Sequence, residues 1–230
     1  MSDAAGRGPA SSRGLVIFDC DGVLVDSMGI DMRELTRAIG AAGGTLTHGE
    51  VERAFHGVAL ADIAHGVAAH LGRPLPEGWM ERFLGERAAA FERELRAVPG
   101  AREAVVGVRA AGWEACIASS GPMGKMEQTL RLAGLRDLFA DERIFSAYAP
   151  AVARPKPAPD LFLHAAAACG HPPQACVVVE DSVPGVTAGR AAGMRTLGYA
   201  DGDPGHADRL AALGAEPLAE LSALPDLLRR

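Results

Sequence analysis

The chain has 230 residues, of which 48% are hydrophobic and 23% are charged, and its formal net charge is -6. This length allows one large domain, or one domain with a smaller insertion, and the composition is typical of a globular protein. The negative charge and the absence of an apolar run long enough to cross a bilayer lead us to expect neither nucleic acid nor a membrane as a partner.

The first residues, MSDAAGRGPASS, lack the apolar core of a signal peptide, and we expect a disordered tail over residues 1–13. The cysteines form no CxxC pair and no Cys/His group with zinc-ligand spacing. Cys116 and Cys176 lie in apolar runs, where a reduced thiol behaves as a small hydrophobic group. Reduced thiols indicate a reducing compartment, so we expect a cytoplasmic protein.

Short continuous apolar runs predict strands that are buried on both faces of a parallel sheet. The runs cover 15–18, 115–118 and 176–179, with weaker candidates at 143–146 and 196–199. Helical patterns alternate with these runs and are expected at 101–111, 125–133, 160–169 and 183–192. The alternation predicts an α/β fold with a doubly wound parallel sheet.

The segment between the first two strands is too long for a simple crossover. It carries helical patterns at 30–39, 49–55, 60–71 and 79–96, separated by breaks that contain Gly and Pro. We therefore expect an all-helical insertion over residues 29–94, with a catalytic core formed by 14–28 and 95–230.

Polar residues collect at the carboxyl ends of the predicted strands, where open α/β sheets bind their ligands. Asp19 and Asp21 follow the first strand, and Ser119 ends the second. Glu180 and Asp181 follow the third, and the loop before it carries Lys156. A single acid in such a place is usually a helix cap or part of a solvated turn. Several acidic side chains that converge with a lysine indicate a functional site.

Acidic side chains that converge would repel one another unless a cation joined them, and oxygen ligands favour Mg²⁺. Lys156 and the Ser119 hydroxyl suit the oxygens of a phosphoryl group, and backbone N–H groups around Ser120 can add an anion-binding helix terminus. The spacing of Asp19 and Asp21 allows one carboxylate to attack phosphorus while the other transfers a proton.

Four motifs, in order along the chain, resemble those of the haloacid dehalogenase-like (HAD) hydrolases. They are FDCDGVLVDS at 18–27, ASSG at 118–121, KPAPD at 156–160 and VVEDS at 178–182. The resemblance implies a Rossmann-like core with a helical cap inserted after the first motif. It identifies the chain as a Mg²⁺-dependent phosphatase that acts through an aspartyl-phosphate.

The same resemblance assigns roles to individual residues. Asp19 is expected to carry the phosphoryl group and Asp21 to act as general acid and base. Mg²⁺ is expected to bind the carboxylates of Asp19 and Asp181 and the backbone carbonyl of Asp21. Glu180 is a weaker metal candidate that would act through water. Ser119, Ser120 and Lys156 are expected to bind phosphate.

Individual residues distinguish this chain from other members of the family. Dehalogenases lack the second acid of the first motif, and P-type ATPases need membrane helices. A β-phosphoglucomutase shares the cap type, but it carries a phosphate-binding arginine where this chain has Leu60 and a histidine where it has Asp31. A leucine and a carboxylate cannot anchor a phosphate dianion, so hydrolysis is favoured. A mutase stays as the alternative, and a non-catalytic phosphate sensor is a third hypothesis.

Residues 119–126 (SSGPMGKM) resemble phosphogluconate phosphatase-type enzymes, which implies a small-molecule sugar or sugar-acid phosphate as substrate. In the cap, His56, Gly57 and Val58 are candidates for specificity. For His56 the interpretation as a solvated loop residue is slightly favoured, and Lys125 is equally explained as an exposed lysine in the first turn of a helix. We expect a monomer or a weak homodimer.

Overall fold

The computed structural model describes residues 12–56, 58 and 60–229. Residues 1–11 of the expected tail and Gly57 of the cap lie outside the described residues. The backbone N–H of Arg13 donates to the carbonyl of Gly112 at 2.9 Å, which joins the start of the described chain to the turn before the second strand.

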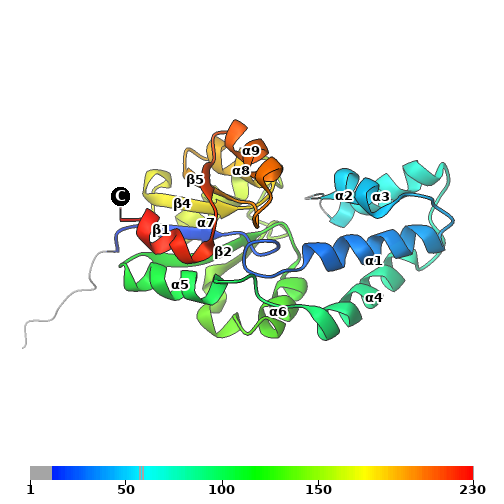
Figure 1. Cartoon of the computed structure of the whole chain (residues 1–230), viewed down its shortest axis with the longest axis horizontal. Coiled ribbons are helices and arrows are strands. Elements are labelled where there is room, and N and C mark those ends of the chain that lie inside the picture. Colours follow the sequence, from blue (N-terminus) through cyan, green and yellow to red (C-terminus); the bar gives the residue numbers. More distant parts are fainter. Residues whose placement is uncertain (1–11, 57, 59, 230) are drawn as a thin grey trace, which may run out of the picture.

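The core is a six-stranded parallel sheet in the order β3-β2-β1-β4-β5-β6, as the alternating pattern predicts (Figure 1). The strands are β1 (Leu15–Phe18), β2 (Glu114–Ser119), β3 (Ile144–Ser146), β4 (Cys176–Glu180), β5 (Arg195–Tyr199) and β6 (Glu216–Leu218). β1 pairs with both β2 and β4, so the strand that leads to Asp19 lies in the middle of the sheet.

Alternation along β1 explains why its four residues are all apolar. Val16 and Phe18 belong to the hydrophobic cluster on one face of the sheet, and Leu15 and Ile17 to the cluster on the other. Because successive side chains of a strand point to opposite faces, a central strand covered by helices on both sides buries every position. This burial holds the end of β1, and hence the start of the site, in a fixed place.

Helices cover both faces of this sheet (Figure 1). One cluster combines the strands with α5 (Ala101–Ala110), α6 (Met123–Leu132) and α10 (Leu224–Leu227), and the other with α7 (Asp160–Ala168) and α8 (Val183–Ala191). α9 (Pro204–Ala212) packs against α8 and β5. Within the described residues, no helix combines the length and apolar character that crossing a bilayer would require.

Of the five helices that the structure describes between β1 and β2, the first four lie to one side of the sheet, as Figure 1 shows. They are α1 (Met28–Ala41), α2 (His48–Phe55), α3 (Leu60–Leu71) and α4 (Trp79–Glu94). They share their own hydrophobic cluster, and the indole of Trp79 donates to the carbonyl of Ala38 at 2.9 Å, which ties α4 to α1. The helical cap is thus present, and its boundaries at 29 and 94 stay a prediction.

Gly85 lies in the middle of α4, is exposed, and has no heavy atom within 4 Å of the position that a Cβ would take. Gly85→Ala is expected to raise the free energy of unfolding by about 0.5–1 kcal/mol, because glycine loses more backbone entropy than alanine in a helix. Denaturant unfolding measures this. In the control Gly107→Ala, the new Cβ would stand 2.6 Å from Pro225 Cγ, so stability should fall. A destabilised Gly85→Ala would contradict the prediction.

Candidate active site

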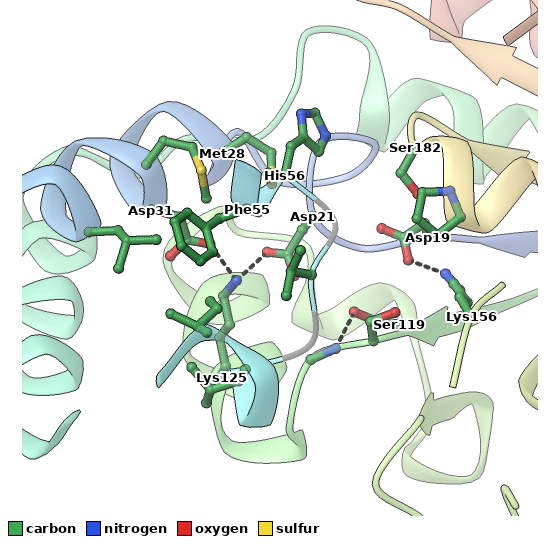
Figure 2. A pocket seen from close by; sticks show the side chains of 18 of the residues that line it. Asp19, Asp21, Met28, Asp31, Phe55, His56, Ser119, Lys125, Lys156 and Ser182 are labelled. Atoms are coloured by element: carbon green, nitrogen blue, oxygen red, sulfur yellow. Dashed lines mark hydrogen bonds and ion pairs between the residues drawn. The ribbon is translucent and has the colours of Figure 1, made fainter. Parts of the chain in front are cut away.

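The polar residues predicted at the strand ends line one pocket between the sheet and the cap (Figure 2). The core residues of the pocket that the sequence singled out are Asp19, Asp21, Ser119, Ser120, Lys156, Glu180 and Asp181. The pocket is also lined from the cap by His56 and Val58. The structure therefore brings together every described residue that the sequence proposed for the site.

Lys156 is the cation at the centre of the core side of this pocket. Its Nζ lies 2.7 Å from Asp19 Oδ1 and 2.7 Å from Glu180 Oε1, and it donates to the Ala118 carbonyl at 3.1 Å. Only 3% of the side chain is exposed. Burial would lower the pKa of this ammonium, but the charges of Asp19 and Glu180 outweigh it and raise the pKa. Lys156 is therefore charged and fixed in place beside Asp19.

Asp19 is almost fully buried at the end of β1. Burial raises the pKa of its carboxyl to about 7; the charges of Glu180 and Asp21 add to this effect, and Lys156 opposes it. An acid with this pKa is only partly ionised at neutral pH. A further cation beside it would favour the carboxylate, which is the nucleophilic form.

Asp21 lies in a different environment, although it is only two residues away. Ser27 donates to its Oδ1 at 2.5 Å, and Lys125 Nζ lies 2.9 Å from the same oxygen. Burial alone would raise the pKa of Asp21, but Lys125 and Ser27 outweigh burial and lower it. The two neighbouring carboxyls therefore have pKa values shifted in opposite directions, upward for Asp19 and downward for Asp21.

Gly22 shapes the loop that separates the two acids from the cap. Its φ is +80°, a value that favours glycine, and its N–H donates to the Val25 carbonyl at 2.9 Å. A Cβ at this position would stand 1.9 Å from Asp181 Oδ2. The glycine therefore lets the Asp181 carboxylate lie directly against the loop that carries Asp21.

The acids of the pocket outnumber its cations. Among the described lining residues, five acidic side chains face three lysine or arginine side chains. Burial raises the pKa of Asp181, and the charges of Glu180 and Asp19 raise it further. Within the described part of the chain, no cluster of three or more His, Cys, Asp or Glu side chains has metal-binding geometry. Two carboxylates and a backbone carbonyl suit Mg²⁺, which often keeps several waters.

Glu180 differs from its neighbour Asp181 in its contacts. Its Oε1 accepts from Lys156, and its Oε2 accepts from the N–H of Ser182 at 2.8 Å and from the Ser182 hydroxyl at 2.9 Å. Both oxygens are thus engaged by protein donors. This arrangement favours holding Lys156 as the function of Glu180, and the expected contact to metal through water stays a prediction.

Ser119 ends β2 with its hydroxyl buried next to the turn into α6. The N–H of Gly121 donates to Ser119 Oγ at 3.0 Å, and the Ser146 hydroxyl fixes the same turn by donating to the Gly121 carbonyl at 2.7 Å. Pro122 caps the helix directly after this turn. The hydroxyl and the nearby helix terminus are therefore placed as an anion site requires.

His56 lines the pocket and also contacts the core. Its ring stacks on His206 of α9 with a centroid distance of 6.0 Å. Burial lowers the pKa of His56, and the nearby His206 lowers it further. The imidazole therefore favours the neutral form.

Lys125 and Arg87 are functional candidates that the sequence revealed only in part or not at all. Lys125 bridges the core and the cap, because its Nζ lies 2.9 Å from Asp21 and 2.7 Å from Asp31 of α1 (Figure 2). Its side chain is only 10% exposed, so the interpretation of Lys125 as an exposed lysine is wrong. Arg87 of α4 lines the same pocket beside Asp31, at 3.6 Å.

A cation inside the buried stripe of α4 is the signal that could have revealed Arg87. The stripe follows helical spacing through Phe83, Arg87 and Phe91, and its other members are apolar. Leu60, which stands where a mutase would carry its phosphate-binding arginine, also lines the pocket. The cap nevertheless contributes a cation to the pocket, because Arg87 comes from α4.

Comparisons with known proteins agree with this geometry. Residues 14–193 match the family described as haloacid dehalogenase-like hydrolase. The chain is 35% identical to 6-phosphogluconate phosphatase of Escherichia coli (strain K12), over 92% of this chain and 93% of that protein.

Solved structures of haloacid dehalogenase-like proteins are also similar to this chain. A haloacid dehalogenase-like protein of unknown function from Agrobacterium tumefaciens has a TM-score of 0.78 at 35% identity, covering 94% of this chain and 97% of that one. A HAD family hydrolase from Deinococcus radiodurans R1, solved with bound phosphate and sodium, has a TM-score of 0.75 at 33% identity, covering 94% of each chain.

Proposed function

The chain belongs to the haloacid dehalogenase-like hydrolases and is a phosphoric monoester hydrolase, and from this premise we propose that it is a Mg²⁺-dependent phosphatase of a sugar or sugar-acid phosphate that acts through an aspartyl-phosphate on Asp19. The observation that carries the proposal is the convergence of Asp19, Asp21 and Lys156 at one edge of the sheet. The substrate class rests on the likeness to 6-phosphogluconate phosphatase.

In this proposal an oxygen of the Asp19 carboxylate attacks phosphorus, and the bond to the leaving oxygen breaks. Asp21 must be protonated at this stage; it donates that proton to the leaving oxygen, and the sugar departs as an alcohol. Asp21, now a carboxylate, takes a proton from water, and the resulting hydroxide attacks the aspartyl-phosphate. Inorganic phosphate leaves and Asp19 is restored. Because Ser27 and Lys125 stabilise the charged form of Asp21, both are suited to hold this carboxylate in place.

Several groups would stabilise the negative charge of the phosphoryl group. Lys156 and the Ser119 hydroxyl would bind phosphoryl oxygens, and the N–H of Ser120 would add a further donor. When bound by Asp19, Asp181 and the Asp21 carbonyl, Mg²⁺ would neutralise charge on the phosphoryl group. Such a cation would also offset the excess of carboxylates in the pocket.

Metal dependence gives a direct test of the proposal. Purified protein is expected to release phosphate from an aryl phosphate and from a panel of sugar phosphates only when Mg²⁺ is supplied. Treatment with a chelator should remove the activity, and excess Mg²⁺ should restore it. Undiminished phosphate release after complete metal removal would contradict the metal site.

Two further parts of the proposal concern the reaction outcome and the location. Arg87 of the cap lies 3.6 Å from Asp31, whose negative charge disfavours a second phosphate dianion there, and this supports hydrolysis over a mutase. A mutase would interconvert hexose phosphates with little free phosphate. The four cysteines are free thiols, which supports the cytoplasm as the compartment.

A further inference from the structure

Arg87 is a buried cation that the proposed chemistry does not use. It is 9% exposed and lines the pocket from α4. Its guanidinium lies 5.5 Å from the ring centre of Phe83 and 5.7 Å from that of Phe91, and these contacts hold it in position. The aromatic rings attract the positive charge but accept no conventional hydrogen bond. Arg87 Nε has no hydrogen-bond partner among the described residues.

Asp31 faces Arg87 from α1 and is also incompletely paired. Its Oδ2 accepts from Lys125 at 2.7 Å, while its Oδ1 has no hydrogen-bond partner in the described part of the chain and lies 3.6 Å from Arg87 Nε. That distance is too long for a hydrogen bond. A buried donor and a buried acceptor that remain unpaired are each costly, and such a pair calls for an explanation such as a ligand.

The pair lies beyond the point where chemistry would occur. Contacts lead from Asp21 to Lys125 at 2.9 Å, from Lys125 to Asp31 at 2.7 Å, and from Asp31 to Arg87 at 3.6 Å. Asp21 would serve the oxygen that leaves phosphorus. The groups at the other end of this chain of contacts would therefore meet the leaving group several bonds beyond that oxygen.

Charge around this part of the pocket is balanced. The carboxylates of Asp21 and Asp31 face the cations of Lys125 and Arg87, and both cations contact a carboxylate. A carboxylate or a second phosphate on the substrate that bound Arg87 would lie beside the negative charge of Asp31. A hydroxyl avoids this conflict, since it can accept from Arg87 and donate to Asp31 at the same time.

We propose that the Asp31–Arg87 pair selects an uncharged, hydroxylated leaving group, so that the substrates are monophosphates of neutral sugars or polyols rather than sugar-acid phosphates or bisphosphates. This inference rests on the proposed phosphatase function and narrows its substrate class. It predicts that the chain differs in preference from its relative in E. coli, whose name specifies a sugar-acid phosphate.

The first test compares substrates on the unmodified enzyme with Mg²⁺. The values of kcat/KM are measured for a hexitol 6-phosphate, for 6-phosphogluconate and for a hexose bisphosphate. The expected result is a preference of about tenfold or more for the hexitol phosphate, because one well-placed hydrogen-bonding group is worth about that much. An equal or greater kcat/KM for 6-phosphogluconate overturns the inference and leaves the phosphatase function intact. If no phosphate monoester at all is hydrolysed, both fail.

The second test uses variants of the pair, with folding checked by thermal unfolding. Arg87→Met is expected to lower kcat/KM for the hexitol phosphate about tenfold more than for p-nitrophenyl phosphate, which has no hydroxyl chain. Asp31→Asn is expected to shift the preference about tenfold towards 6-phosphogluconate, because Arg87 loses its counter-ion. Arg93→Met, at an exposed arginine of the same helix, serves as the matched control. Equal losses on all substrates in both variants would mean a structural ion pair and would overturn the inference.

Discussion

Replacement of Asp19 by asparagine is expected to lower the rate of phosphate release by at least ~10³-fold, because an amide cannot form the aspartyl-phosphate. The side chain keeps its size, and the amide oxygen can still accept from Lys156, whose second partner Glu180 is unchanged. The loss should therefore appear in kcat, with a melting temperature close to that of the unmodified protein. Steady-state phosphate release and thermal unfolding measure the two effects separately.

Asp26→Asn is the matched control for that experiment. Asp26 lies in the same motif, but it is exposed and its backbone N–H donates to the Arg96 carbonyl at 3.0 Å. Its substitution should leave activity within a few-fold of the unmodified enzyme. Rapid quenching followed by mass spectrometry should detect a phosphorylated peptide containing Asp19 only where the carboxylate is present. Activity of Asp19→Asn comparable to that of the control would eliminate Asp19 as nucleophile.

The core of the fold and the core of the site were predictable from sequence because both depend on local pattern and on topology. Apolar runs mark β1, β2 and β4, and the carboxyl ends of parallel strands meet at one edge of a sheet. Polar residues that follow these runs must then lie close together. β6 escaped prediction because two of its three residues, Glu216 and Pro217, are exposed and give no apolar run.

The acidic pair in the fourth motif shows where pattern alone fails. Glu180 and Asp181 are adjacent, and both carry the ligand type that Mg²⁺ prefers. Consecutive residues at the end of a strand point in different directions, so they face different partners. Glu180 turns to Lys156 and Ser182, whereas Asp181 lies against Gly22.

The cap was less predictable because its polar contacts join residues that are distant in the chain. Lys125 and Asp31 are separated by 94 positions, and they meet only after α6 of the core and α1 of the cap are in place. Sequence periodicity gives the buried face of α4, but it does not tell which helix lies opposite Arg87. For this reason the arginine that pairs with Asp31 could not be found by comparison at Leu60.

Lys156→Met is expected to lower both activity and stability, because it leaves Asp19 and Glu180 buried together without their shared cation. Removing one partner of a buried ion pair costs about 3–5 kcal/mol in the free energy of unfolding. Loss of a group that stabilises charge on a phosphoryl group is expected to lower kcat about 10²-fold or more. Denaturant unfolding and phosphate release measure the two losses.

The stability deficit of this variant should depend on pH. Burial already raises the pKa of Asp19 to about 7, and Lys156 is the group that opposes this rise, so its removal raises the pKa of Asp19 further. An acid whose pKa is higher in the folded than in the unfolded chain binds more protons when folded, and folding is then favoured as the pH falls. The deficit should therefore be larger at pH 8 than at pH 6. The double variant Lys156→Met/Glu180→Gln should recover part of the stability, since one buried charge is removed, but none of the activity. A deficit that is independent of pH, or activity restored by the second substitution, would show that Lys156 does not act as the shared cation of these two acids.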